Sequence, residues 1–201
     1  MQHSIIIALA IGFILGTSST YFLTKEPVKD TNALIAEFYA IENAVHVSPH
    51  GLRAKMSHGE ADKFVLVDLR SQEEYETAHI VTSLNVPAYK DPNTSAYDET
   101  DRIIKSFKEI IEKNPNKDVI VYCYSSPCMT GRKIGQVLAQ NNIYVKHLGI
   151  GWNEWRYEWN TWNHDAETPT KVEDYIATGT EPGTPPKSDF VPACTQGGLG
   201  C

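Results

Sequence analysis

The residues best suited to chemistry are two cysteines in mid-chain, Cys123 and Cys128. Cys123 directly follows a β-branched run at 119–122, and a helical pattern begins near Thr130. At such a junction, converging backbone N–H groups and the positive end of the helix dipole stabilise a thiolate. The sequence therefore predicts a lowered pKa and a nucleophilic role for Cys123, with a buried structural cysteine as the alternative.

The elements that must position these cysteines alternate along the chain. Strand patterns cover residues 64–67, 84–86, 119–122 and 144–148, and helical patterns cover 30–44, 99–113 and 130–140. Strands separated by helices indicate an α/β fold with a parallel sheet and helices on both faces. Such sheets bind ligands beyond the carboxyl ends of their strands, which is where Cys123 is expected.

Further polar residues follow the first of these strands, in a segment 66–87 that reads LVDLRSQEEYETAHIVTSLNVP. We interpret Asp68, Arg70 and Glu74 as an ion-pair and capping network that organises the fold. His79 is interpreted as a hydrogen-bonded packing residue. No histidine lies near a cysteine at metal-ligand spacing in the sequence, so a zinc site is not expected.

Taken in order, these motifs resemble the rhodanese-like family over roughly residues 45–159. The matching features are Asp-x-Arg after a strand, Glu-Tyr, a His-Ile pair, a strand ending in Pro87, the cysteine loop, and the segment VKHLGIGWNEW. The resemblance implies a sulfurtransferase in which Cys123 carries sulfane sulfur as a persulfide. It implies a small sulfur-donor anion such as thiosulfate, a thiol or other nucleophilic acceptor, and no metal or organic cofactor.

The cysteine loop departs from the family pattern. The common loop runs six residues from its cysteine to an arginine, whereas here the first arginine after Cys123 is Arg132, nine positions on. The loop is therefore about two residues longer, and its anion-binding guanidinium is either missing or supplied by Arg132 folding back. A longer loop favours a larger oxyanion, but phosphatases need the loop arginine, and its absence counts against them.

Within this loop, Cys128 is a candidate resolving thiol. Its attack on a Cys123 persulfide or sulfenic acid would form a disulfide and release the sulfur product, whereas the alternative is a cysteine that only packs. Three functions stay open: a sulfurtransferase, a dithiol redox protein, and a rhodanese-fold binding module without turnover. The backbone N–H groups expected to hold the terminal sulfur belong to Tyr124, Ser125, Ser126 and Met129.

Composition restricts the class of protein. The chain has 201 residues, so we expect one domain with additions, and its hydrophobic content of 41% excludes wholesale disorder. Its net charge is −7 and no long basic run is present in the sequence, which argues against a nucleic-acid partner.

The start of the chain is strongly apolar. Residues 5–24 carry no charge, and their length suits a helix across a hydrocarbon core of about 30 Å. We predict a signal anchor over residues 1–24, with a cleaved signal peptide or a buried core helix as alternatives. A helical lead-in over 25–44 follows, capped by Asp30 or Thr31. The folded part is then expected outside the cytoplasm, as a periplasmic or cell-surface domain, or secreted after cleavage.

The last part of the predicted domain, residues 45–163, carries a stripe of tryptophans. Core packing is the first interpretation, and a face that contacts a protein partner or the membrane is the alternative. The stripe consists of Trp152, Trp155, Trp159 and Trp162.

A C-terminal extension over 164–201 completes the chain. From Thr178 onward it is rich in Gly and Pro, so we expect an extended or mobile tail. Cys194 and Cys201 near its end could form a disulfide, or a tail thiol could accept sulfur from Cys123. The tail is also a candidate contact for a protein partner.

Overall fold

The computed structural model describes residues 30–163 and 169–187, and the chain divides into two compact units, residues 1–41 and 42–201. The predicted anchor at 1–24 lies outside the described residues. In the described ranges, no helix is long and apolar enough to span a membrane. Helix α2 (Thr31–Val45) is capped by Asp30, whose Oδ1 accepts a hydrogen bond from the N–H of Ala33 at 2.7 Å, as the sequence predicts.

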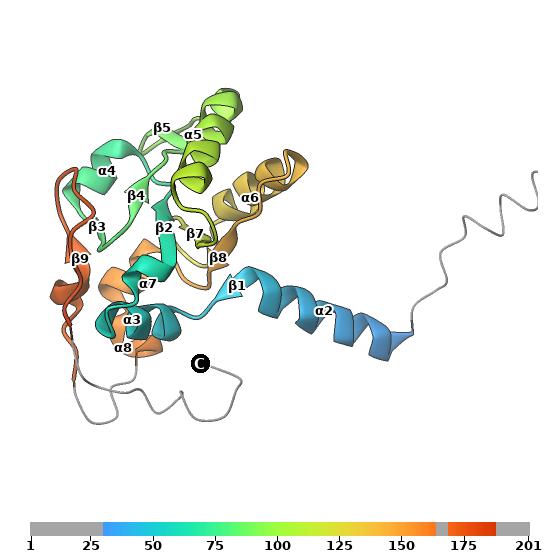
Figure 1. Cartoon of the computed structure of the whole chain (residues 1–201), viewed down its shortest axis with the longest axis horizontal. Coiled ribbons are helices and arrows are strands. Elements are labelled where there is room, and N and C mark those ends of the chain that lie inside the picture. The colour runs from blue at the N-terminus through green and yellow to red at the C-terminus, as the bar shows by residue number, and fades with distance from the viewer. Residues whose placement is uncertain (1–29, 164–168, 188–201) are drawn as a thin grey trace, which may run out of the picture. The chain divides into compact units, whose positions relative to one another are not determined.

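The second unit contains a five-stranded parallel sheet in the order β1-β8-β7-β2-β4 (Figure 1). Its strands are β1 (His46–Val47), β2 (Phe64–Asp68), β4 (Leu84–Asn85), β7 (Asp118–Tyr122) and β8 (Lys146–Leu148). The helices are α3 (Pro49–Ser57), α4 (Gln72–Thr77), α5 (Thr100–Lys113), α6 (Thr130–Gln140), α7 (Trp152–Tyr157) and α8 (Trp159–Trp162). The predicted α/β class with a parallel sheet is confirmed.

Shorter elements complete the unit. They are the antiparallel pairs β3 (His79–Ile80) with β9 (Ile176–Ala177) and β5 (Tyr89–Asp91) with β6 (Thr94–Ser95), and the 3-10 turns η1 (Ala61–Lys63), η2 (Tyr97–Glu99) and η3 (Val172–Tyr175). The sequence patterns did not predict α3, the β5–β6 hairpin or β9. Each is too short or too polar to show a clear hydrophobic period.

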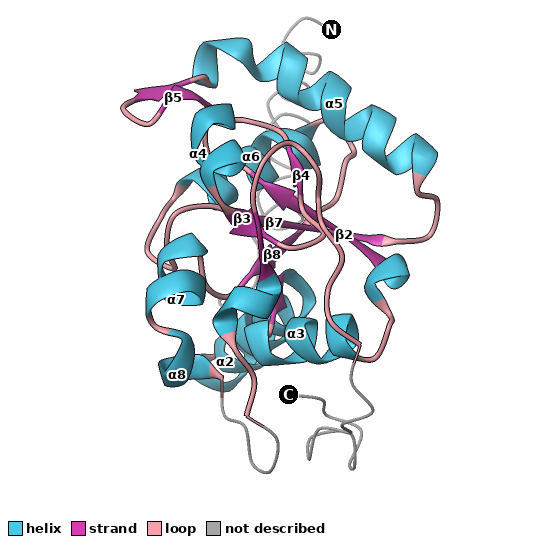
Figure 2. Cartoon of the chain, turned by 90° about the vertical axis from the view of Figure 1, so that its left-hand side faces the viewer, coloured by secondary structure: helices cyan, strands magenta, loops and turns pink. Residues whose placement is uncertain are grey.

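Both faces of the sheet are covered because alternate strand residues point to opposite sides. Val65 and Val67 of β2 pack with α5 and α6, whereas Phe64 and Leu66 pack with α3, α7 and α8. Figure 2 shows the strands between these two groups of helices. All five residues of β2 are buried, which is typical of a central parallel strand.

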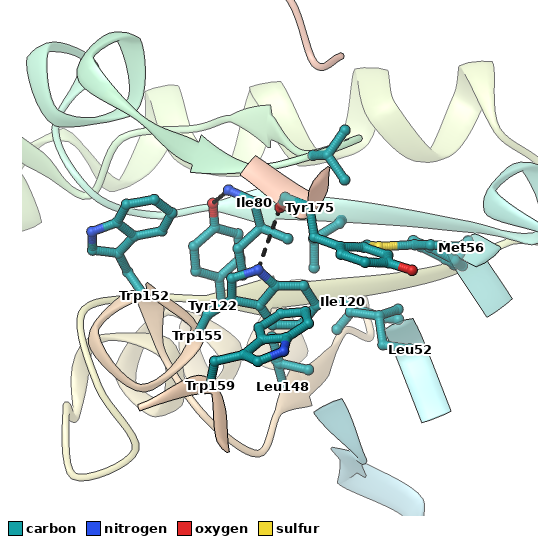
Figure 3. Packing of buried hydrophobic residues seen from close by; sticks show 13 residues of the cluster. Leu52, Met56, Ile80, Ile120, Tyr122, Leu148, Trp152, Trp155, Trp159 and Tyr175 are labelled. Atoms are coloured by element: carbon teal, nitrogen blue, oxygen red, sulfur yellow. Dashed lines mark hydrogen bonds between the residues drawn. The ribbon is translucent and has the colours of Figure 1, made fainter. Parts of the chain in front are cut away.

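Trp152, Trp155 and Trp159 belong to the core on the second face (Figure 3), and Trp162 packs against it. Trp152, Trp155 and Trp159 are 8%, 0% and 7% exposed, and Trp162 stacks on Trp155 at 4.9 Å between ring centroids. The packing interpretation therefore agrees with the structure. The alternative of a partner-facing stripe is wrong for the three buried tryptophans, because α3 and η3 cover the face on which they lie.

The chain beyond residue 169 contributes to the same core. Tyr175 is 2% exposed, its hydroxyl lies 2.6 Å from Ser57 Oγ, and its carbonyl accepts a hydrogen bond from Trp155 Nε1 at 3.3 Å (Figure 3). The N–H of Gly179 donates to the Glu76 carbonyl at 2.7 Å. The expectation of a loose tail from residue 178 is therefore wrong for 178–182, because backbone hydrogen bonds fix this segment to the domain. Cys194 and Cys201 lie outside the described residues.

Candidate active site

A buried ionic network lies where β2 and β7 end. Arg70 Nη2 donates to Asp68 Oδ2 at 2.6 Å, and the Tyr122 hydroxyl donates to the same oxygen at 2.6 Å. The Arg70 guanidinium also lies over the Trp152 ring, 4.4 Å from its centroid. Burial raises the pKa of Tyr122, and the charge of Asp68 adds to this effect, so the phenol stays protonated. The network fixes Tyr122, the residue directly before Cys123.

Glu74 and His79 also act as supports. Glu74 forms a capping box with Ser71 at the start of α4, and it accepts a short hydrogen bond from the Tyr124 hydroxyl. The His79 ring stacks on Tyr75 at 3.7 Å, and its two nitrogens lie 2.7 and 3.0 Å from the carbonyls of Tyr75 and Glu181. These contacts agree with the organising roles that the sequence analysis gives to both residues.

The start of the cysteine loop is tied to the first turn of α7. The carbonyls of Cys123 and Tyr124 accept hydrogen bonds from the N–H groups of Trp152 and Asn153, both at 2.8 Å. A β-carbon on Gly151 would lie 2.2 Å from the backbone nitrogen of Ser125, so only glycine allows the loop to pass this close. The glycine-containing motif before α7 therefore positions the loop.

Glu154 holds the middle of the loop. Its Oε1 accepts hydrogen bonds from the N–H and the hydroxyl of Ser126, both at 2.9 Å, and its Oε2 accepts one from Gly151 N–H at 2.9 Å. Although burial opposes it, these amides lower the pKa of Glu154. The expectation that the Ser126 amide holds the terminal sulfur is wrong here, because Glu154 occupies that amide.

Arg132 folds back onto the loop, one of the two outcomes the sequence left open. Its Nη1 donates to the carbonyls of Ser126 and Cys128 at 3.0 and 3.2 Å. The N–H of Cys128 donates to the Ser125 carbonyl at 3.0 Å, which closes a turn inside the loop. The guanidinium therefore clasps the loop backbone, and binding of an anion by Arg132 stays a prediction.

The two loop sulfurs are in direct contact, with Cys123 Sγ and Cys128 Sγ 3.1 Å apart and both thiols free. Cys123 is 2% exposed, whereas Cys128 is partly exposed. Hydrogen bonding between the two sulfurs lowers the pKa of Cys128 to about 4, and Thr130 and the N–H of Tyr124 also lower it. The same contact, together with burial, raises the pKa of Cys123.

The lowered pKa is therefore at Cys128 and not at Cys123, contrary to the expectation from the sequence. We place the negative charge on Cys128 because it is the more exposed sulfur and because the N–H of Thr130, in the first turn of α6, also stabilises it. The residue spacing placed both sulfurs between β7 and α6, but it did not show which sulfur the surrounding hydrogen-bond donors would reach.

Two tyrosines near the sulfurs were missed by the sequence analysis. The hydroxyls of Tyr89 and Tyr97 lie 2.8 and 2.9 Å from Thr130 Oγ1, and the Tyr89 ring meets the Tyr124 ring edge-on at 5.1 Å. The sequence signal near them is the turn-forming segment 91–94, which reads DPNT and lies between the two tyrosines.

A cavity of about 750 Å³ opens beside the loop. Its lining includes Arg70, Tyr124 and Trp152, which lie two to four positions after the ends of β2, β7 and β8, together with Glu173 and Ile176. This is the place where open α/β sheets bind ligands. Within the described residues, no cluster of three His, Cys, Asp or Glu side chains is arranged to hold a metal ion.

The family model named Rhodanese, described as a rhodanese-like domain, matches residues 48–158. The HTH-type transcriptional regulator Rv0324 of Mycobacterium tuberculosis is 27% identical to this chain over 97 residues, which are 48% of this chain and 36% of that regulator. This chain therefore covers about a third of the length of that relative.

Similar solved structures include the BH2092 protein of Bacillus halodurans and a full-length protein of Lactobacillus plantarum. The first is 25% identical with a TM-score of 0.45, and the match covers 62% of this chain and 80% of that chain. The second is 18% identical with a TM-score of 0.46, and the match covers 63% of this chain and 92% of that chain.

Proposed function

Since the chain belongs to the rhodanese-like domain family, we propose that it is a sulfurtransferase whose loop dithiol carries and releases sulfane sulfur. The observation that carries this proposal is the 3.1 Å contact between Cys123 Sγ and Cys128 Sγ at the carboxyl end of β7. A single cysteine would suffice to hold a persulfide, whereas two sulfurs in contact provide a nucleophile together with a base or a resolving thiol.

Sulfur uptake needs the charge of the sulfur pair on Cys123. Because the pKa of Cys128 lies far below that of Cys123, the proton moves across the 3.1 Å contact to Cys128 only as Cys123 attacks. Its sulfur attacks the outer sulfur of thiosulfate, the S–S bond of thiosulfate breaks, and sulfite leaves with the electron pair. Cys123 then carries the outer sulfur as a persulfide. Cys128 acts as the base in this step.

Sulfur release has two routes. In the first, an external thiolate attacks the outer sulfur, takes it up as a new persulfide and returns Cys123 to the thiolate. In the second, the Cys128 thiolate attacks Cys123 Sγ, a Cys123–Cys128 disulfide forms and hydrosulfide leaves with the electron pair. A dithiol reductant must then reduce the disulfide. The 3.1 Å contact favours the second route because Cys128 already touches the sulfur it would attack.

The test is to load the full-length protein with thiosulfate labelled in its outer sulfur and to locate the label by peptide fragmentation. We expect Cys128→Ser to keep the label on Cys123, because no resolving thiol is present, and the wild-type protein to release labelled hydrosulfide. Cys123→Ser is expected to take up no label. Full labelling of Cys123→Ser, or of the double variant, would overturn the assignment of the sulfur carrier.

A second candidate function is a dithiol redox protein, which the same sulfur–sulfur contact also favours. Forming a disulfide of about 2.05 Å from 3.1 Å needs only a small shift of the loop. The two candidates separate in one measurement. A redox protein oxidises to the disulfide with an ordinary disulfide as oxidant and leaves thiosulfate unchanged, whereas the sulfurtransferase forms one sulfite for each thiosulfate consumed.

A further inference from the structure

The segment between β4 and α5 brings two phenols to one hydroxyl group. Tyr89 of β5 and Tyr97 of η2 both place their hydroxyls on Thr130 Oγ1, at 2.8 and 2.9 Å. Thr130 is the first residue of α6, lies directly after the cysteine loop and is 3% exposed. A buried hydroxyl with two phenols on its oxygen needs a physical explanation, because either phenol alone would satisfy it.

Contacts on both sides hold the phenols in place. Lys90 of the hairpin forms an ion pair of 2.7 Å with Asp98 of η2, so the two tyrosine-bearing elements are joined. The Tyr89 ring also packs edge-on against the ring of Tyr124 in the loop. The Tyr97 ring lies 5.3 Å below the Lys133 ammonium. The meeting of the phenols at Thr130 is therefore built by several independent contacts.

The two phenols and the Thr130 hydroxyl together have three protons to place in hydrogen bonds. A threonine oxygen accepts two hydrogen bonds and donates one, and each phenol has one proton to give. If both phenols donate to Thr130 Oγ1, both of its acceptor positions are filled and its own proton must go to a third group. A thiolate can only accept, so the neighbouring sulfur is the natural recipient of that proton.

We propose that Tyr89 and Tyr97 are positioning residues that fill both acceptor sites of the Thr130 hydroxyl and thereby direct its proton to the charged sulfur of the loop. The proposal rests on the proposed function in one respect, namely that this sulfur pair is the reactive group. It gives the β5–β6 hairpin and η2 a role in preparing the thiolate for sulfur transfer.

The electrostatics of the site support this arrangement. The Thr130 side chain helps to lower the pKa of Cys128, and it opposes the rise in the pKa of Cys123 that Cys128 and burial cause. Burial raises the pKa of Tyr89, and the two thiols raise it further, so this phenol keeps its proton. Of the other titratable or charged groups, Tyr124 and His147 interact electrostatically with the sulfur pair, Arg132 contacts the Cys128 carbonyl, and Tyr97 meets Tyr89 at Thr130.

The experiment measures iodoacetamide alkylation of Cys128 as a function of pH in the full-length protein and in Tyr89→Phe, Tyr97→Phe and the double variant. We expect the pKa of Cys128 to rise in the double variant, so that alkylation at about pH 5 falls roughly fivefold, with smaller losses in each single variant. Thr130→Val should show a loss of about tenfold, and Thr130→Ser should restore the wild-type profile.

Tyr144→Phe is the matched control, since Tyr144 is 74% exposed and its loss should leave the profile unchanged. A double variant with the wild-type profile would overturn the proposal, whatever its stability. If the double variant does not fold, the single variants decide in the same way, because each removes one of the two donors. Thiosulfate loading of the wild-type protein, measured in parallel, separates the two proposals. If the wild-type protein loads sulfur and the double variant keeps the wild-type alkylation profile, only the positioning role is rejected. If the profile of the double variant shifts but the wild-type protein takes up no sulfur, only the sulfurtransferase is rejected.

Discussion

Two neighbouring regions at the carboxyl ends of the strands are built in opposite ways. In the ionic network, Asp68 has two partners at 2.6 Å, the Arg70 guanidinium and the Tyr122 hydroxyl, and all three side chains are nearly or fully buried. In the cysteine loop, the two sulfurs are hydrogen-bonded at 3.1 Å, and Cys128 is partly exposed.

We call the Asp68–Arg70–Tyr122 network the rigid region and the cysteine loop the reactive region, and the first positions the second. Both carboxylate oxygens of Asp68 accept hydrogen bonds in the network, so a displacement of Arg70 would leave a buried charge without its partner. Tyr122 directly precedes Cys123 in the chain. Arg70 stacks on the Trp152 ring, and the backbone N–H of Trp152 donates to the Cys123 carbonyl at 2.8 Å. The network therefore fixes the backbone at the first sulfur. In the loop beyond it, the lowered pKa of Cys128 provides a thiolate in contact with the Cys123 thiol.

The sharpest test of the rigid region is Arg70→Ala, which leaves Asp68 buried without its cation. We expect the free energy of unfolding to fall by about 3–5 kcal/mol, the usual cost of removing one partner of a buried ion pair. Urea denaturation measures this loss. Lys146→Ala is the control, since its pair with Asp118 at 2.8 Å is exposed and should contribute about 0–1 kcal/mol. Equal losses in the two variants would contradict the comparison.

The reactive region is tested by Cys128→Ser, which removes the ionised thiol. The pKa of Cys128 is lowered to about 4, whereas an ordinary thiol near 8.5 is ionised to only roughly 0.3% at about pH 6. We expect alkylation at that pH to fall about tenfold to 100-fold. Because a group whose pKa is lowered in the fold contributes stability above that pKa, the free energy of unfolding at that pH should fall as well.

Cys123→Ser is the matched variant for this prediction. It keeps Cys128 and its contacts with Thr130, but it removes the thiol whose hydrogen bond lowers the pKa of Cys128 most. Its alkylation rate at about pH 6 should therefore lie between those of the wild-type protein and Cys128→Ser. If Cys123→Ser proves the slower of the two variants, the charge sits on Cys123, and our placement of the thiolate is wrong.

The sequence predicted the rigid region better than the reactive one. Asp68 and Arg70 are two positions apart, and their pairing needs only a strand end and a turn, so local pattern sufficed to assign their role. The sheet, α5 and α6 were predicted for the same reason, because long apolar periods show in the sequence. The contact between Tyr175 and Ser57 is 118 positions long, and no local signal indicated it.

The details of the loop depend on groups that come from far along the chain. Glu154 reaches Ser126 across 28 positions, and Tyr89 reaches Thr130 across 41. No local sequence pattern indicates that a carboxylate occupies the Ser126 amide, or that the hydrogen-bond donors of the loop favour Cys128. Such assignments require the three-dimensional positions of side chains, since hydrogen-bond donors act only within about 3 Å.

Glu154 holds the middle of the cysteine loop, and Glu154→Ala should loosen the loop. It loses the hydrogen bonds to Ser126 and Gly151, for which we expect a loss of about 1.5–3 kcal/mol in urea denaturation. Because the pKa of Glu154 is lowered in the fold, its contribution is present above the unfolded value near 4.3 and disappears as the pH falls through the folded value.

Glu154→Gln supplies the pH control, since it keeps the shape of the side chain but cannot titrate. Below the folded pKa of Glu154, the stability difference between wild-type protein and Glu154→Gln should become small. A difference that stays constant across the acid range would show that the carboxylate charge does not hold the loop.

The smallest expected effect concerns Arg132, whose Nη1 clasps the carbonyls of Ser126 and Cys128. Because this side chain is exposed, Arg132→Ala should cost only about 0.2–1 kcal/mol of stability and should slow thiosulfate loading about threefold. We expect Arg132→Lys to lose as much, because a lysine lacks the planar fork that reaches the loop backbone.

The effect of added salt distinguishes an Arg132 that holds the loop backbone from an Arg132 whose charge attracts the thiosulfate anion. Exposed charges are screened over about 8–10 Å at moderate ionic strength, whereas a backbone clasp is not. If Arg132 acts as a clasp, the ratio of wild-type to variant loading rates stays constant as salt is added. If Arg132→Lys instead keeps the wild-type rate of thiosulfate loading, and added salt lowers that rate in the wild-type protein, Arg132 is the anion-binding cation. The reactive region then extends from the two sulfurs to the start of α6.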